Sequence, residues 1–174
     1  MRKLLFACTA LCLCIALVAP VAVAGPKDAK KDAHDCSTCK DMEKSGSGWC
    51  DHCKMGMVAH VMAKTEKLYK AMKDSSFAKT LASGMEVKAS DIKCGECKKM
   101  AEDHKDGFCK KCDGGLVMGH FYKGKDGFEK AEHAMKVMMD ASKARCAGCA
   151  TAMVSDGKCD HCKVAYKDGK KTKA

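Results

Sequence analysis

The sequence predicts an α+β fold in which small β-hairpin modules, each stapled at four clustered cysteines, follow one another and are linked by amphipathic helices. Three observations support this. The pair Cys-x-x-Cys occurs six times, always as a pair of pairs. Short apolar segments with β-branched residues follow two of the double pairs. Two longer segments place apolar residues at helical spacing. We therefore expect several small cores rather than one large one.

The double pairs form three copies of one cysteine pattern. Spacers of ten, eleven and nine residues separate the two pairs of each copy, and a glycine stands two positions before each third cysteine. We expect each spacer to form two short strands and a turn. The copies are Cys36, Cys39, Cys50 and Cys53; Cys94, Cys97, Cys109 and Cys112; and Cys146, Cys149, Cys159 and Cys162.

The repeat extends past the cysteines. Residues 56–58 and 115–117 have matching Gly-apolar-Val sequences, and His60 and His120 follow them at places that we take as equivalent. The third copy ends near Tyr166 and lacks the histidine and the tail. Because the segments that follow the cysteines also match, we interpret the chain as an internal repeat of two and a half units.

Four segments between the cysteine groups have a predictable secondary structure. Residues 57–63 and 116–122 are short and apolar, and each is predicted to form a strand. Residues 65–81 and 128–144 have apolar side chains at intervals of three and four, which indicates two amphipathic helices of about four turns.

These patterns divide the chain into six parts. The flanking segments are charged and have no apolar period, so we expect them to be disordered. The parts are a signal peptide (1–24), a disordered leader (25–35), a four-cysteine module with a helix (36–82), a second module with a helix (83–144), a truncated third module (145–166) and a basic tail (167–174).

The N-terminus is typical of an export signal. Arg2 and Lys3 precede an apolar run over residues 4–18, and small residues lead up to Ala24, after which the chain turns polar. We expect cleavage after Ala24 and a periplasmic or secreted mature protein. A retained N-terminal anchor is the alternative. The apolar run is short for a bilayer crossing, so we expect no stable membrane span after cleavage.

Two Cys-x-x-Cys turns brought together present four soft ligands at the corners of a tetrahedron. This arrangement suits a structural Zn²⁺ ion with Zn–S bonds of about 2.3 Å and no open position. The pattern resembles the zinc-ribbon class, in which two knuckles on a β-hairpin hold one zinc. The resemblance implies tandem metal-stapled, zinc-ribbon-like modules and three zinc ions held by the twelve cysteines named above. Lys54, Asp113 and Lys163 stand where ribbons usually have a glycine.

Other chemistries fit the same cysteines. Cu⁺ or Fe ions also accept thiolate ligands. Exported proteins meet oxidants, so crosswise structural disulfides are an alternative to metal. Thiol oxidoreductases use Cys-x-x-Cys at a helix start within a βαβ context, and the order of elements expected here does not match that context. Covalent haem attachment is excluded, because no pair is followed by histidine.

The histidines and methionines leave further alternatives. His60 and His120 are candidates for contacts behind the ligands or for a second metal, and packing or surface roles are the plainer interpretation. His52 and His161 lie inside knuckles, where side chains face solvent. The thirteen methionines suit Cu(I) sequestration together with thiolates, although Met also fills small helical cores.

The function predicted from the sequence is metal binding without catalysis. No acid/base pair, nucleophile constellation or phosphate loop is present. The net charge of +10 is spread over scattered lysines with few aromatics between them, which argues against nucleic-acid binding. We expect an exported protein with three structural zinc sites, acting as a scaffold or an envelope metal buffer. Its partners would be metal ions and an unidentified envelope protein. Copper sequestration or resistance, a disulfide-stapled protein and a thiol oxidoreductase are the alternatives.

Overall fold

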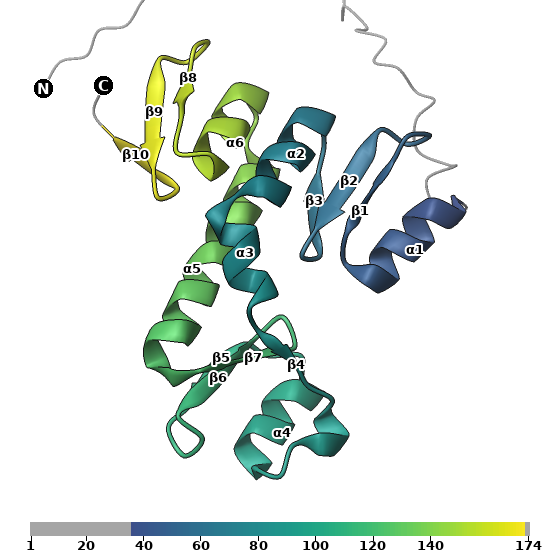
Figure 1. Cartoon of the computed structure of the whole chain (residues 1–174), viewed down its shortest axis with the longest axis vertical. Coiled ribbons are helices and arrows are strands. Elements are labelled where there is room, and N and C mark those ends of the chain that lie inside the picture. Colours follow the sequence, from purple (N-terminus) through teal and green to yellow (C-terminus); the bar gives the residue numbers. More distant parts are fainter. Residues whose placement is uncertain (1–35, 173–174) are drawn as a thin grey trace, which may run out of the picture. The chain divides into compact units, whose positions relative to one another are not determined.

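A computed structural model describes residues 36–172. Residues 36–172 combine short helices with small antiparallel sheets, which confirms the α+β class (Figure 1). The predicted signal peptide and leader, at residues 1–35, and the last two residues of the predicted basic tail lie outside the described range. Among the helices of residues 36–172, none combines the length and the apolar character that a bilayer crossing requires.

One structural unit occurs three times: a helix, a short strand, a turn and a β-hairpin. We call the copies module 1 (36–63), module 2 (94–123) and module 3 (146–172). Module 1 holds α1 (Ser37–Ser45), β1 (Gly48–Cys50), β2 (Met55–Val58) and β3 (Val61–Ala63). Module 2 holds α4 (Gly95–Glu102), β5 (Gly107–Cys109), β6 (Gly114–Val117) and β7 (His120–Lys123). Module 3 holds α6 (Ala147–Val154), β8 (Lys158–Cys159), β9 (Val164–Lys167) and β10 (Lys170–Thr172).

The remaining elements link the modules. Between modules 1 and 2 lie α2 (Glu66–Asp74), α3 (Ser76–Ala82), β4 (Met85–Glu86) and the short 3₁₀ helix η1 (Ala89–Asp91). The helix α5 (Gly124–Lys143) joins modules 2 and 3. The strands are antiparallel in the orders β1-β2-β3, β4-β7-β6-β5 and β8-β9-β10. In each module the third cysteine pairs with the first residue of the middle strand.

The hairpins of all three modules turn through two residues with positive φ. These are Ala59 and His60, Met118 and Gly119, and Asp168 and Gly169. Two successive positive φ values are the mark of the type I′ turn, whose twist matches that of the flanking strands. The third module therefore has a complete hairpin. Lys170–Thr172, which we expected to be part of a mobile basic tail, forms its outer strand β10.

A polar side chain caps each of these turns. The capping residue lies three positions before the third cysteine of its module. Asp106 Oδ1 accepts a hydrogen bond from the N–H of Met118 at 2.7 Å, and Asp156 Oδ1 accepts one from the N–H of Asp168 at 2.6 Å. In module 1 the oxygen is Ser47 Oγ, 3.4 Å from the N of Ala59. The glycines two positions before each third cysteine could be recognised in the sequence, but these caps were not predicted.

The spacers between the cysteine pairs are where the expected secondary structure is wrong. Each spacer contains the rest of a helix that starts at the first pair and then one short strand, instead of two strands and a turn. The helices α1 and α4 each bury one residue, Met42 and Cys97. A helix with so narrow a buried face leaves no periodic apolar signal in the sequence.

The segments after the second pairs also differ from the predictions. Residues 57–63 and 116–122 each contain two strands and a turn, not one strand. The helix expected over residues 65–81 is interrupted at Ser75, which caps α3. The helix expected over residues 128–144 is present, and it begins earlier, at Gly124.

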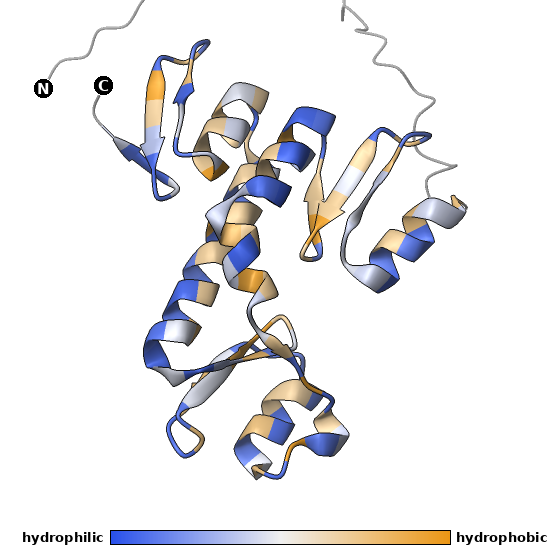
Figure 2. Ribbon diagram, in the orientation of Figure 1, coloured by the Kyte–Doolittle hydropathy of each residue, from blue (hydrophilic) through white to orange (hydrophobic). Residues whose placement is uncertain are grey.

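One large apolar core joins the modules, in place of the separate small cores that we expected, and a second, small cluster of Ala152, Cys159 and Tyr166 lies within module 3. Buried residues of this core come from module 1, α2, α3, module 2, α5 and module 3; they include Val58, Leu68, Met72, Phe77, Leu81, Val117, Phe128, Met138 and Val154. The helix α5 packs against α3, α6, β3 and β6. Hydrophilic and hydrophobic residues alternate along α5, as a helix with one buried face requires (Figure 2).

Candidate metal centres

The first cysteine pair of each module lies at the start of a helix. Cys36 is the N-cap residue of α1, and Cys94 and Cys146 hold the same position on α4 and α6. The second cysteine of the pair follows in the first helical turn. Because the first N–H groups of a helix have no partner within it, they are free to donate hydrogen bonds to a sulfur at the N-cap.

The second pair of each module lies in the turn between the first two strands. The N–H of Cys53 donates to Cys50 Sγ and that of Cys162 donates to Cys159 Sγ, both at 3.4 Å. The residue after each turn is left-handed: φ is 51° at Lys54, 46° at Asp113 and 57° at Lys163. Glycine takes this conformation without steric cost, which explains why zinc ribbons usually have glycine there.

The two pairs of every module meet, which confirms the prediction of three four-cysteine groups. In each group the four Sγ atoms lie within 4.8 Å of one another. The Sγ–Sγ distances are 3.5 Å for Cys36–Cys50 and for Cys97–Cys112, 3.8 Å for Cys94–Cys109 and 3.7 Å for Cys146–Cys159. A regular tetrahedron with metal–sulfur bonds of about 2.3 Å has an edge of about 3.8 Å. The thiols therefore fit a tetrahedral metal ion.

The helix start makes one thiol of each group easy to ionise. The pKa is lowered to about 6 at Cys36, to about 7 at Cys94 and to about 6 at Cys146. In each case the main cause is the backbone N–H three residues on, which lies near the sulfur, with further help from neighbouring thiols. A thiolate at a helix N-terminus is stabilised in this way.

Burial has the opposite effect on the pKa of a second thiol in two of the groups. It raises the pKa of Cys39 and of Cys97 well above the usual range, with neighbouring thiols adding to the shift. A group with one thiolate thus resists forming the next, because like charges in a confined site repel. A cation at the centre would remove this obstacle, so four thiolates together require a bound metal ion.

The surroundings of the sulfurs differ among the modules. In module 3 the Tyr166 side chain packs beside Cys149; burial and the interaction with this cysteine raise the pKa of Tyr166 to about 12. His161 Nδ1 lies 3.5 Å from Cys162 Sγ, and in module 1 His52 Nδ1 lies 3.7 Å from Cys53 Sγ. Both histidines are exposed, as predicted from their place inside the knuckles. Tyr166 was not predicted to lie at the site, because only one copy carries a tyrosine there.

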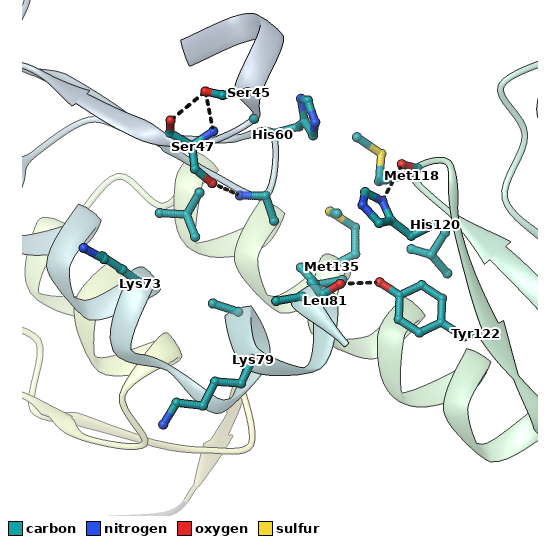
Figure 3. A pocket seen from close by; sticks show the side chains of 16 residues that line it. Ser45, Ser47, His60, Lys73, Lys79, Leu81, Met118, His120, Tyr122 and Met135 are labelled. Carbon is teal, nitrogen blue, oxygen red and sulfur yellow. Dashed lines mark hydrogen bonds between the residues drawn. The ribbon is translucent and has the colours of Figure 1, made fainter. Parts of the chain in front are cut away.

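His60 and His120 are not equivalent, contrary to our alignment of the copies. His60 is the second residue of its hairpin turn, where module 2 has Gly119, whereas His120 is the first residue of β7. Their side chains nevertheless line one cavity of about 340 Å³ (Figure 3). The single extra residue in module 2 explains the error.

Comparisons with known proteins found no matching family, no matching curated protein and no matching solved structure. The similarity to zinc ribbons therefore rests on the cysteine geometry of the three modules. No activity, partner or location comes to this chain from a relative.

Proposed function

We propose that this protein is an exported, non-enzymatic zinc protein in which each module holds one structural Zn²⁺ ion, and that it serves as a scaffold or a metal buffer in the cell envelope. One observation carries the proposal: all three groups bring four Sγ atoms within 4.8 Å, at tetrahedral edge lengths. Each ion would tie a helix start to a hairpin knuckle, in a zinc-ribbon-like hairpin arrangement.

The form of the sites supports a structural role. Four thiolates fill the coordination sphere of zinc and leave no position for water or substrate, which is the arrangement of structural rather than catalytic zinc. The third cysteine of each module is almost fully buried: Cys50, Cys109 and Cys159 are 1%, 0% and 1% exposed. Export remains a prediction from the N-terminal sequence.

Thiol redox chemistry is the second candidate, and one observation favours it. The first pair of each module lies at a helix start and contains a thiol of lowered pKa, which is the local arrangement of dithiol oxidoreductases. The order of elements expected from the sequence had argued against this. Each pair, however, has a second pair beside it, so its thiols face further thiols rather than an open surface.

Native mass spectrometry of the mature protein, purified without added metal, separates these functions. We expect three zinc masses on the native protein and twelve free thiols after denaturation. A denatured mass that is lower by twelve hydrogens, with no metal released, would show disulfides and contradict the proposal. Turnover in a dithiol assay by the metal-free protein would support the redox candidate instead.

A Cys97→Ser variant tests whether the sites bind independently. Cys97 is 3% exposed, and serine has nearly the same volume, so the shared core should survive. We expect two zinc ions per chain, held by modules 1 and 3. Loss of all three ions would show that the sites depend on one another. Ser90→Ala, at an exposed side chain of the linker, is the control and should keep three.

A further inference from the structure

Three exposed methionines gather at one place, away from the thiol groups. Within residues 36–172 four large apolar side chains are strongly exposed, and three of them, Met62, Met118 and Met139, are 44%, 44% and 41% exposed. These three line one cavity together with His60 and Met135. His60, Met118 and Met135 also line the cavity of about 340 Å³ that contains His120. Methionine commonly fills gaps in apolar cores. That role does not explain why the thioethers of these exposed methionines converge on a solvent-accessible cavity beside a histidine.

The ring of His120 is oriented so that one nitrogen is available. Its Nδ1 lies 3.2 Å from the carbonyl oxygen of Met118. Because a carbonyl only accepts, Nδ1 carries the proton and Nε2 has a free lone pair. A hydrogen bond from one ring nitrogen to a backbone carbonyl is the usual support of a metal-binding imidazole.

His60 is held at the same cavity by a strained backbone. Its φ is 62°, in a turn position where modules 2 and 3 have Gly119 and Gly169. Its N–H donates to the carbonyl of Gly46 at 2.8 Å, and its ring packs on Gly46, where any side chain would collide with it. Within residues 36–172 the ring has no hydrogen-bond partner. A non-glycine residue kept in a costly conformation is often functional.

Figure 3 shows the side chains of His60, Met118, His120 and Met135 pointing into the same space between the two hairpin turns and α5. We propose that this space is a binding site for a soft monovalent metal ion, Cu(I), with the imidazoles of His60 and His120 and the thioether of Met118 as ligands. Thioether and imidazole are ligands that Cu(I) accepts. The site is separate from the three zinc sites and adds a second metal to the proposed function.

The charges around the cavity favour a monovalent soft ion over a divalent hard one. The lining contains no carboxylate, and it includes Lys73 and Lys79. Calcium and magnesium require oxygen ligands, usually carboxylates, and the lining of this cavity provides no carboxylate for them. The imidazole nitrogens and the thioether sulfur are neutral ligands. Binding of Cu(I) therefore adds only one positive charge to the cavity.

Silver(I), enriched in a spin-½ isotope, is the probe, because it is a redox-stable substitute for Cu(I) and its scalar couplings identify its ligands. Silver is titrated into the zinc-loaded protein. We expect a silver resonance correlated by NMR with the Met118 ε-methyl protons and with ring protons of His60 and His120. Silver taken up by thiols would correlate with cysteine β-protons and is thereby distinguished.

Two variants make the test specific. His60→Gly with His120→Ala should abolish the Met118 correlation and leave any cysteine correlations in place; glycine suits the left-handed position, and an unchanged zinc count shows that the modules are folded. Met85→Leu, at a methionine that is 64% exposed and outside this cavity, should change nothing. Silver correlated with cysteines alone in the unaltered protein, or a Met118 correlation that survives the double substitution, would overturn the proposal. The zinc count before silver is added tests the proposed function separately.

Discussion

At the residue scale, two glycines of module 2 differ in the room that they leave for a side chain. Gly115 lies at the centre of the module 2 sheet, and a Cβ there would come within 2.6 Å of the Gly107 carbonyl oxygen and would also collide with the Phe128 ring. Gly95, in the first turn of α4, has nothing within 4 Å of such a Cβ. The two positions form a matched pair for substitution.

Gly115→Ala is expected to lower the free energy of unfolding by about 1–3 kcal/mol, because the backbone of β5 must move to admit the methyl group. Urea denaturation of the metal-loaded protein measures this. Gly95→Ala should stay within about 0.5 kcal/mol of the unaltered protein. Equal effects of the two substitutions on the free energy of unfolding would show that the sheet accommodates the added methyl group more easily than its contacts indicate.

Tyr166→Phe is expected to weaken metal binding in module 3 alone by about tenfold or more, because it keeps the ring and removes the hydroxyl beside Cys149 that would donate to the thiolate of the metal-bound form. Competition with a chromophoric chelator gives the affinity. The control is Tyr69→Phe, whose ring stacks against Trp49 at 5.6 Å between centroids and whose hydroxyl contacts no cysteine. An unchanged module 3 affinity would mean that the Tyr166 hydroxyl has no influence on the metal.

At the element scale, one serine divides the linker helix into two. The Ser75 hydroxyl donates to the carbonyl of Met72 at 2.6 Å and accepts from the N–H of Ala78 at 3.1 Å. It therefore both ends α2 and begins α3. The change of direction lets Leu68 and Phe77 enter the same core from different helices.

Ser75→Ala is expected to cost about 1 kcal/mol, the typical value for removing a helix N-cap, which corresponds to a fall in the midpoint temperature of about 3 °C for a chain of this size. Scanning calorimetry measures it. Ser76→Ala, at the exposed neighbouring position, is the control. If both variants unfold at the same temperature as the unaltered protein, the cap contributes nothing to stability.

The secondary structure of the modules could not be predicted from cysteine spacing alone. A spacer of nine to eleven residues is long enough for either a hairpin or a short helix. Only the burial of Met42 or Cys97 distinguishes the helix from the hairpin. The long helix α5 was predictable because it buries seven residues at regular intervals. The hairpin turns were missed because Ala59, His60 and Met118 are unusual residues for a type I′ turn.

At the scale of the whole molecule, the shared core changes what metal removal should do. Small four-cysteine units with separate cores would depend on metal for folding, but α2, α3 and α5 bury apolar side chains against one another without help from the cysteines. The helices α1 and α4 begin at candidate metal ligands and each bury one residue.

Chelation of the metal is therefore expected to speed amide hydrogen exchange in α1 and α4 first, while α5 keeps much of its protection. Exchange followed by mass spectrometry, with and without a strong chelator, resolves the helices, and adding zinc back should restore the original pattern. Simultaneous loss of protection in all helices would show that core and metal sites form one cooperative unit.

The sequence by itself determined the grouping of the twelve cysteines, because ligands that are close in sequence are brought together by local turns whatever the rest of the chain does. It also determined α5, whose apolar period is long enough to read. Only the tertiary structure decided that the modules share one core, and that His60 meets Met118 and His120. These residues belong to different modules, and their meeting depends on how apolar faces of α3 and α5 pack, which no local pattern of residues specifies.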